Sequence, residues 1–85
     1  MNIQIHSLKF DADKRLLDFV HQKVGKLTQF GEDIVNAEVY LRLDKDQTKG
    51  NKVSEIKVDL SGKPLFARRQ SKTFEEATDS AVDAL

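Results

Sequence analysis

Oxygen-bearing side chains at regular spacing in the segment DKDQTKGNKVSE, residues 44–55, come closest to a metal-binding motif in this sequence. Asp44, Asp46 and Thr48 fall at positions 1, 3 and 5 of a calcium-binding loop, with Glu55 at position 12. Position 6 of such a loop needs a glycine for its sharp turn, and Lys49 stands there instead. Strand-like flanks and the three lysines of the segment also disfavour a cation. The sequence therefore predicts a polar loop and no metal site.

Groups that could carry out acid–base or nucleophilic catalysis are sparse. The chain has no cysteine, and neither His6 nor His21 has a second histidine or a carboxylate at ligand spacing. The glycine–lysine sequences at residues 49–51 and 61–63 lack the spacing of a phosphate-binding loop and do not lead into a helix. We therefore expect no enzyme activity, no catalytic residue, no cofactor and no small-molecule substrate.

Charge is the remaining feature that could serve binding. The 85 residues carry 14 basic and 14 acidic side chains, so the formal net charge is zero. Residues 44–72 nevertheless hold eight basic and four acidic groups, whereas residues 73–85 hold four acids and no base. Such a polarised chain can bind a polyanion through one face while its total charge stays near zero. A solvated surface with ordinary solubilising charges is the alternative interpretation.

Hydrophobic periodicity predicts the elements that position these charges. Alternation indicates strands over residues 2–9, 35–43 and 55–60, and a less regular edge or bulged strand over 65–70. Apolar residues at helical spacing predict a helix from about Ala12, capped by Asp11, to Phe30, with Gly31 ending it. Thr73 and Glu76 form a capping box that predicts a second helix from Phe74.

The second predicted helix reaches Leu85 without a glycine, a basic residue or a proline to end it. We expect it to be truncated at its C-terminal end relative to a longer parent. The order β-α-β-β-β-α, with two amphipathic helices, predicts a single α+β domain over residues 1–85. Its architecture is a two-layer sandwich in which both helices cover one face of a four-stranded sheet. No secretory signal or membrane-spanning run is present, so we expect a cytoplasmic protein with no membrane partner.

Three segments share a pattern of apolar, basic and acidic residues with one known family. They read Leu17-x-Phe19-Val20-x-x-Lys23-x-x-Lys26-Leu27-x-x-Phe30, Val39-Tyr40-Leu41-Arg42-Leu43-Asp44-Lys45 and Phe74-x-x-Ala77-x-Asp79-x-Ala81-Val82-Asp83-x-Leu85. In this order the segments resemble the ribosome hibernation-promoting factors and ribosome-associated inhibitors, also known as sigma-54 modulation proteins. The resemblance implies a fold similar to double-stranded RNA-binding domains and no catalytic activity.

The resemblance also implies a partner, the small ribosomal subunit and its rRNA, bound in the channel of messenger and transfer RNA during stress or stationary phase. Such a protein inhibits translation. A protein-interaction adapter that regulates transcription or translation without RNA contact is the alternative. The resemblance and the excess of basic groups in residues 44–72, the basic central segment, together predict RNA-binding side chains. Once the chain has folded, these side chains are expected to converge into one continuous surface. These residues are Lys23, Lys26, Arg42, Lys45, Arg68 and Arg69.

Overall fold

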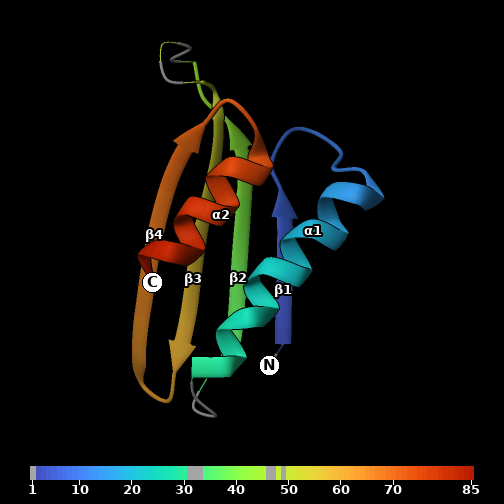
Figure 1. Ribbon diagram of the computed structural model, residues 1–85. Coiled ribbons are helices and arrows are strands. Elements are labelled where there is room, and N and C mark those ends of the chain that lie inside the picture. The colour runs from blue at the N-terminus through green and yellow to red at the C-terminus, as the bar shows by residue number, and fades with distance from the viewer. Residues whose placement is uncertain (1, 31–33, 46–47, 49) are drawn as a thin grey trace.

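The computed structural model describes residues 2–30, 34–45, 48 and 50–85, which form one sheet and a helical layer (Figure 1). In chain order the elements are β1 (Asn2–Ser7), α1 (Lys14–Gly25), the 3-10 helix η1 (Lys26–Phe30), β2 (Ile34–Leu43), β3 (Lys52–Leu60), β4 (Lys63–Ser71) and α2 (Phe74–Ala84). The predicted α+β fold with the element order β-α-β-β-β-α is confirmed.

The four strands lie side by side in the order β1-β2-β3-β4. β1 pairs with β2 in parallel, which requires the crossover that α1 supplies, and the other neighbouring pairs are antiparallel. Both helices cover the same face of the sheet, with α1 toward β1 and α2 over β3 and β4 (Figure 1). The opposite face, which we call the open face, is covered by none of the helices that the structure describes (Figure 1).

α1 begins two residues later than the sequence predicted. Its N-cap is Asp13, whose carboxylate accepts the backbone N–H of Leu16 at 2.9 Å, and Asp11 precedes the cap. The α-helix ends at Gly25, and η1 continues it to Phe30 in a tighter winding. The prediction of one uninterrupted α-helix to residue 30 was therefore wrong, and Gly31 lies outside the described residues.

The second helix follows its prediction closely. The Thr73 hydroxyl accepts the backbone N–H of Glu76 at 3.0 Å, so the expected cap is confirmed and α2 begins at Phe74. Its buried face includes Thr78, which the apolar pattern did not select. The Thr78 hydroxyl donates to the Ser54 hydroxyl of β3 at 3.1 Å, so this buried polar pair is satisfied and ties α2 to the sheet.

The strands differ from their predictions mainly at their ends. β1 stops at Ser7, two residues early, and β3 begins at Lys52 rather than near Glu55. β4 is an edge strand, as expected, but its register with β3 is unbroken from Lys63 to Ser71. The apolar–polar alternation of this segment is weak, but its backbone forms a regular strand because it pairs with β3. Tertiary contacts here override the local sequence pattern.

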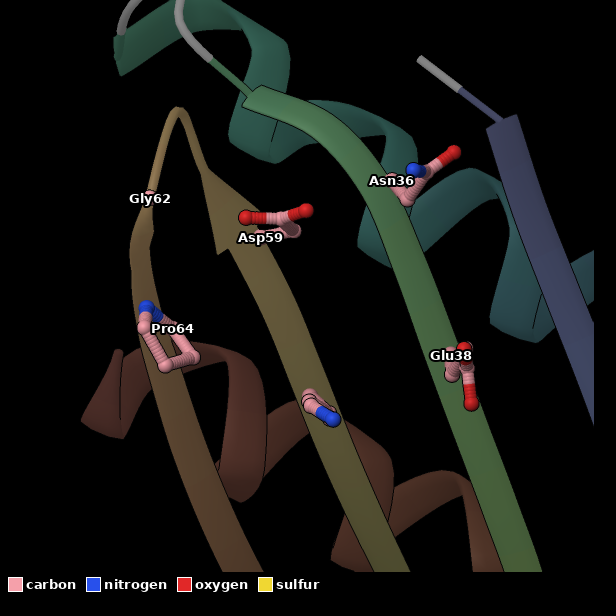
Figure 2. A pocket seen from close by; sticks show the side chains of 6 residues that line it. Asn36, Glu38, Asp59, Gly62 and Pro64 are labelled. Carbon is pink, nitrogen blue, oxygen red and sulfur yellow. The ribbon is translucent and has the colours of Figure 1, made fainter.

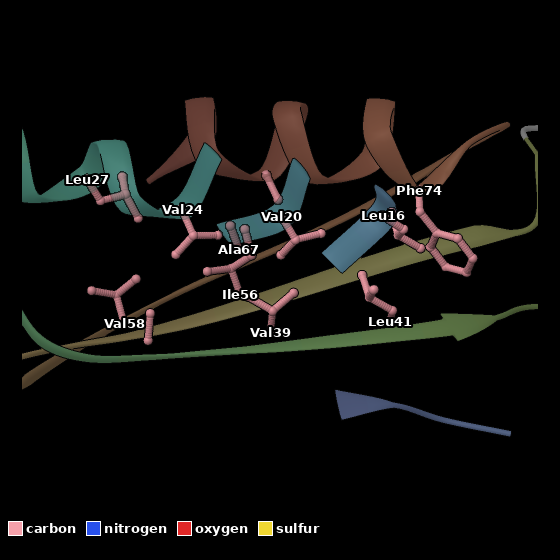
Figure 3. Packing of buried hydrophobic residues seen from close by; sticks show 12 residues of the cluster. Leu16, Val20, Val24, Leu27, Val39, Leu41, Ile56, Val58, Ala67 and Phe74 are labelled. Carbon is pink, nitrogen blue, oxygen red and sulfur yellow. The ribbon is translucent and has the colours of Figure 1, made fainter. Parts of the chain in front are cut away.

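The hydrophobic core lies between the helices and the covered face of the sheet (Figure 3). α1 inserts one side chain per turn, and the central strands β2 and β3 supply alternate residues. The buried cluster comprises Leu16, Val20, Val24, Leu27, Ala37, Val39, Leu41, Ile56, Val58, Ala67, Phe74 and Ala81. This packing fixes which side chains remain on the open face.

Candidate nucleic-acid interface

Lys23 lies where α1 faces α2, and a carboxylate holds it there. Its Nζ is 3.1 Å from Oδ1 of Asp79 in α2 and 5.7 Å from the centre of the Phe19 ring, one turn earlier in α1. The ion pair links the two helices across their contact. Asp79 thus offsets the charge that the sequence prediction assigned to a phosphate.

Arg42 and Arg68 lie on the open face, where both guanidinium groups contact Glu55 of the strand between them. Arg68 Nε is 3.7 Å from Glu55 Oε1, and Arg68 Nη2 is 3.8 Å from Asp44 Oδ2. The Glu55 side chain is only 17% exposed, so it is held between its two partners. We call Arg42, Asp44, Glu55 and Arg68 the arginine cluster. Its two positive and two negative charges cancel.

The other three predicted residues make no ion pair within the part of the chain that the structure describes. Lys26 opens η1 in the helical layer, whereas Lys45 follows the end of β2 in the sheet, so the two lysines come from different layers of the fold (Figure 1). Arg69 is exposed on β4, and its side chain faces the opposite way from that of Arg68.

The six basic side chains therefore do not converge into one continuous basic surface, and that expectation was wrong. Two physical causes separate them. Adjacent residues of a strand point to opposite faces, and carboxylates remote in sequence neutralise half of the set. Only Arg42 and Arg68 are brought together. Whether any of the six contacts RNA stays a prediction.

Aromatic rings gather on the open face. Tyr40 projects from it, and the His6 ring stacks on Tyr40 with centroids 4.9 Å apart. Phe66 shares this face through its pairing with Lys57 and is 61% exposed. The Tyr40 hydroxyl donates to the Glu38 carboxylate, and this hydrogen bond raises the pKa of Tyr40, helped by desolvation and the negative charge of Glu38.

A hollow of about 310 Å³ lies on the open face near the turn between β3 and β4 (Figure 2). Its lining mixes carboxylates, an amide and an ammonium group, and consists of Asn36, Glu38, Lys57, Asp59, Gly62 and Pro64. Among the described residues, no three metal-ligating side chains gather into a cation site. Asp46 of the calcium-like segment lies outside those residues. The charges lining the hollow alternate in sign, so it has no strong preference for an anion.

The comparison that decides the family covers almost the whole chain. Residues 3–85 match the model of the family described as Sigma 54 modulation protein / S30EA ribosomal protein. The chain belongs to this family. The match spans the three motif segments of α1, β2 and α2, so the resemblance drawn from those segments is confirmed.

Two solved structures show the S30EA-family fold in other proteins. A ribosomal subunit interface protein from Coxiella burnetii is similar with a TM-score of 0.84 and 19% sequence identity, over 99% of this chain and 88% of that one. The N-terminal domain of Protein Y from Thermus thermophilus is similar with a TM-score of 0.82 and 27% identity, over 99% and 90% of the two chains. No curated protein matches the sequence significantly.

The S30EA-family fold leaves this chain with two contrasting surfaces. The helical layer carries Lys26 without an ion-pair partner among the described residues, and the open face carries the neutralised arginine cluster. No described helix has the length and apolar character needed to cross a membrane.

Proposed function

We propose that this protein binds the small ribosomal subunit through its rRNA, in the channel of messenger and transfer RNA, and inhibits translation during stress or stationary phase. The observation that carries the proposal is the family match over residues 3–85. The similar fold of a protein named for the ribosomal subunit interface supports the same partner. Binding alone blocks the channel, so no reaction is catalysed, and the protein acts in the cytoplasm, where translating ribosomes are.

Three cations are proposed to contact phosphates directly. Lys26, Lys45 and Arg69 are exposed and make no ion pair among the described residues, so no carboxylate there has to be displaced before they bind. Contacts to phosphates position a protein on RNA without reading its sequence, and they suit a folded ribosomal RNA. Lys23, Arg42 and Arg68 would contribute only where RNA competes with Asp79, Glu55 or Asp44.

Replacing Lys26 with glutamate is expected to weaken binding to small subunits by roughly tenfold and to reduce the salt slope by about one unit. A pull-down of purified small subunits over rising salt measures both quantities. Lys14→Glu is the matched control, because it makes the same charge change at an exposed site in the first turn of α1. Equal losses for the two variants, or salt-insensitive binding of the native protein, contradict direct phosphate contact by Lys26.

Replacing Glu55 with glutamine is expected to tighten RNA binding severalfold, because it removes the carboxylate that holds Arg42 and Arg68. Each arginine released to a phosphate steepens the dependence of log affinity on log salt by about 0.7 to 0.9. The same salt-series pull-down, compared with Asp59→Asn on the same strand, checks the effect. Unchanged or weaker binding by Glu55→Gln would show that the arginine cluster serves the fold and not RNA.

Nuclease treatment separates this function from the adapter alternative. A complex held by ribosomal RNA is expected to dissociate when the RNA is digested. An adapter that binds a protein regulator through an exposed strand edge keeps its partner after digestion. A nuclease-resistant complex recovered from cell extract would therefore replace ribosome binding with the adapter function.

A further inference from the structure

β4 forms one free edge of the sheet, and it exposes apolar side chains on both faces. β3 pairs with only one side of β4, and no other strand of the described residues pairs with its other side. Leu65 is 41% exposed and Phe66 is 61% exposed, and adjacent strand residues point to opposite faces. An edge of this kind is a template for pairing with another strand.

The turn before β4 determines which backbone groups point outward. Ser61 and Gly62 both have positive φ, 40° and 93°, as in a two-residue type I′ hairpin turn. Such a turn is closed by hydrogen bonds between its flanking residues, here Leu60 and Lys63. The backbone N–H and C=O groups of Lys63 point toward β3, and this direction alternates from one residue to the next. The groups of residues 65, 67 and 69 therefore also point toward β3. Those of residues 66, 68 and 70 point outward, away from the sheet.

We propose that two copies of this chain associate by antiparallel pairing of their β4 strands about a two-fold axis at Ala67. Ala67 is the middle residue of Lys63–Ser71, so this register pairs the strand with its copy over its full length. Phe66 then lies opposite Arg68 of the second copy. Both residues have outward-pointing backbone groups. The Arg68 carbonyl accepts from Nη1 of its neighbour Arg69 at 2.8 Å within one copy, and its second lone pair accepts the Phe66 N–H, so the pair exchanges two hydrogen bonds on each side of the axis.

The side chains of β4 are complementary to themselves in this register. On the open face, each Phe66 ring meets the guanidinium of Arg68 from the second copy, a pairing that cation–π attraction favours. On the helix face, each Leu65 meets the aliphatic stem of Arg69 from the second copy. Every exposed apolar side chain of the strand is thereby covered, and no two like charges lie directly opposite each other.

Neighbouring registers lack this complementarity. An axis at Phe66 places Lys63 opposite Arg69 of the second copy, so two like charges meet. An axis at Arg68 places the two Arg68 side chains directly opposite each other. Pro64 has no N–H to donate in any of these registers, so charge alone selects Ala67, and this association does not depend on ribosome binding.

Sedimentation equilibrium of the full chain tests the association. The average mass is expected to rise from 9.6 kDa toward twice that value as the concentration increases from about 10 µM to about 1 mM, a range suited to a small interface. Phe66→Lys puts an ammonium group opposite Arg68 and is expected to abolish the rise. Leu43→Lys, at a side chain 49% exposed in the interior strand β2, is the matched control and retains it.

A single cysteine tests the register. The chain has no cysteine, so Ala67→Cys introduces one thiol. The two Ala67 residues form a non-hydrogen-bonded pair at the two-fold axis, which brings their Cβ atoms to about 4.5 Å, the upper end of the range for a disulfide. Ala67 is only 5% exposed in one copy, so random collisions crosslink it poorly. We expect a disulfide-linked dimer on mild oxidation, formed at least several times faster than with the exposed Leu43→Cys.

Three results overturn self-association through β4. The first is a constant mass of 9.6 kDa at all concentrations, which would show that the arginines and Pro64 protect the edge from pairing. The second is a Phe66→Lys variant that associates like the native chain. The third is slower crosslinking by Ala67→Cys than by Leu43→Cys, with folding of both variants verified by circular dichroism.

Discussion

Replacing Gly50 with alanine is expected to lower the free energy of unfolding by about 2–5 kcal/mol, because it combines backbone strain with a steric clash. Gly50 has a φ of 85°, which L side chains rarely adopt. An added Cβ would lie 2.3 Å from the carbonyl carbon and oxygen of Ser71 and 2.5 Å from the Lys72 nitrogen. These are backbone atoms, so they cannot rotate away, and the loop that carries Lys45 must shift.

The variant Gly62→Ala separates the destabilisation due to backbone strain from that due to the steric clash. Gly62 also has a positive φ, 93°, but an added Cβ there meets nothing within 4 Å. This variant is expected to lose only about 1–2 kcal/mol, the cost of the left-handed backbone alone. Thermal unfolding measures the difference, with roughly 4–8 °C of melting temperature per kcal/mol for a domain of this size. Equal losses for the two variants would show that Gly50 does not pack tightly against the end of β4.

Replacing Ile56 with alanine is expected to cost about 2–5 kcal/mol, a large fraction of the roughly 4–13 kcal/mol that stabilises a chain of this length. Ile56 is fully buried at the centre of the sheet, between Val39 of β2 and Ala67 of β4. Because strands flank it on both sides and helices cover it, the surrounding structure cannot collapse fully into the cavity. Urea unfolding followed by circular dichroism gives the loss.

Ile56→Val is the graded control, because it removes one methylene and keeps the β-branched shape. It is expected to cost about 0.5–1.5 kcal/mol. Leu43→Ala removes a larger group at a side chain 49% exposed and is expected to cost less than Ile56→Ala. A small effect at Ile56 with a large one at Leu43 would mean that the core does not lie between the helices and the covered face.

The arginine cluster changes the interpretation of the basic central segment. Its net positive charge is a property of composition, whereas the field at the surface depends on where each carboxylate lies. Glu55 comes from the same segment and holds Arg68 of that segment together with Arg42, which precedes it, so part of the excess charge is compensated locally. Lys26, Lys45 and Arg69, which form no ion pair with a described residue, therefore offer the most direct test of RNA binding.

Local sequence signals predicted the architecture. The capping threonine at 73 fixed the start of α2, and period-two alternation identified β2 because its covered face is buried and its open face is not. The errors lie where local signals conflict. Asp11 and Asp13 can both cap a helix, and only the observed hydrogen bond to Leu16 distinguishes them. Polar Thr78 entered the core because Ser54, remote in sequence, satisfies its hydroxyl.

The amino-acid sequence by itself determined the class of fold, the order of its elements, the family and the list of available cations. Periodicity and capping are local, so they can be read from neighbouring residues. Only the tertiary structure decided which cations are neutralised. Asp79 reaches Lys23 because α2 packs beside α1, and Glu55 reaches Arg42 and Arg68 because β3 lies between their strands. Coulomb energy depends on distance in space, and that distance is set by packing rather than by separation along the chain.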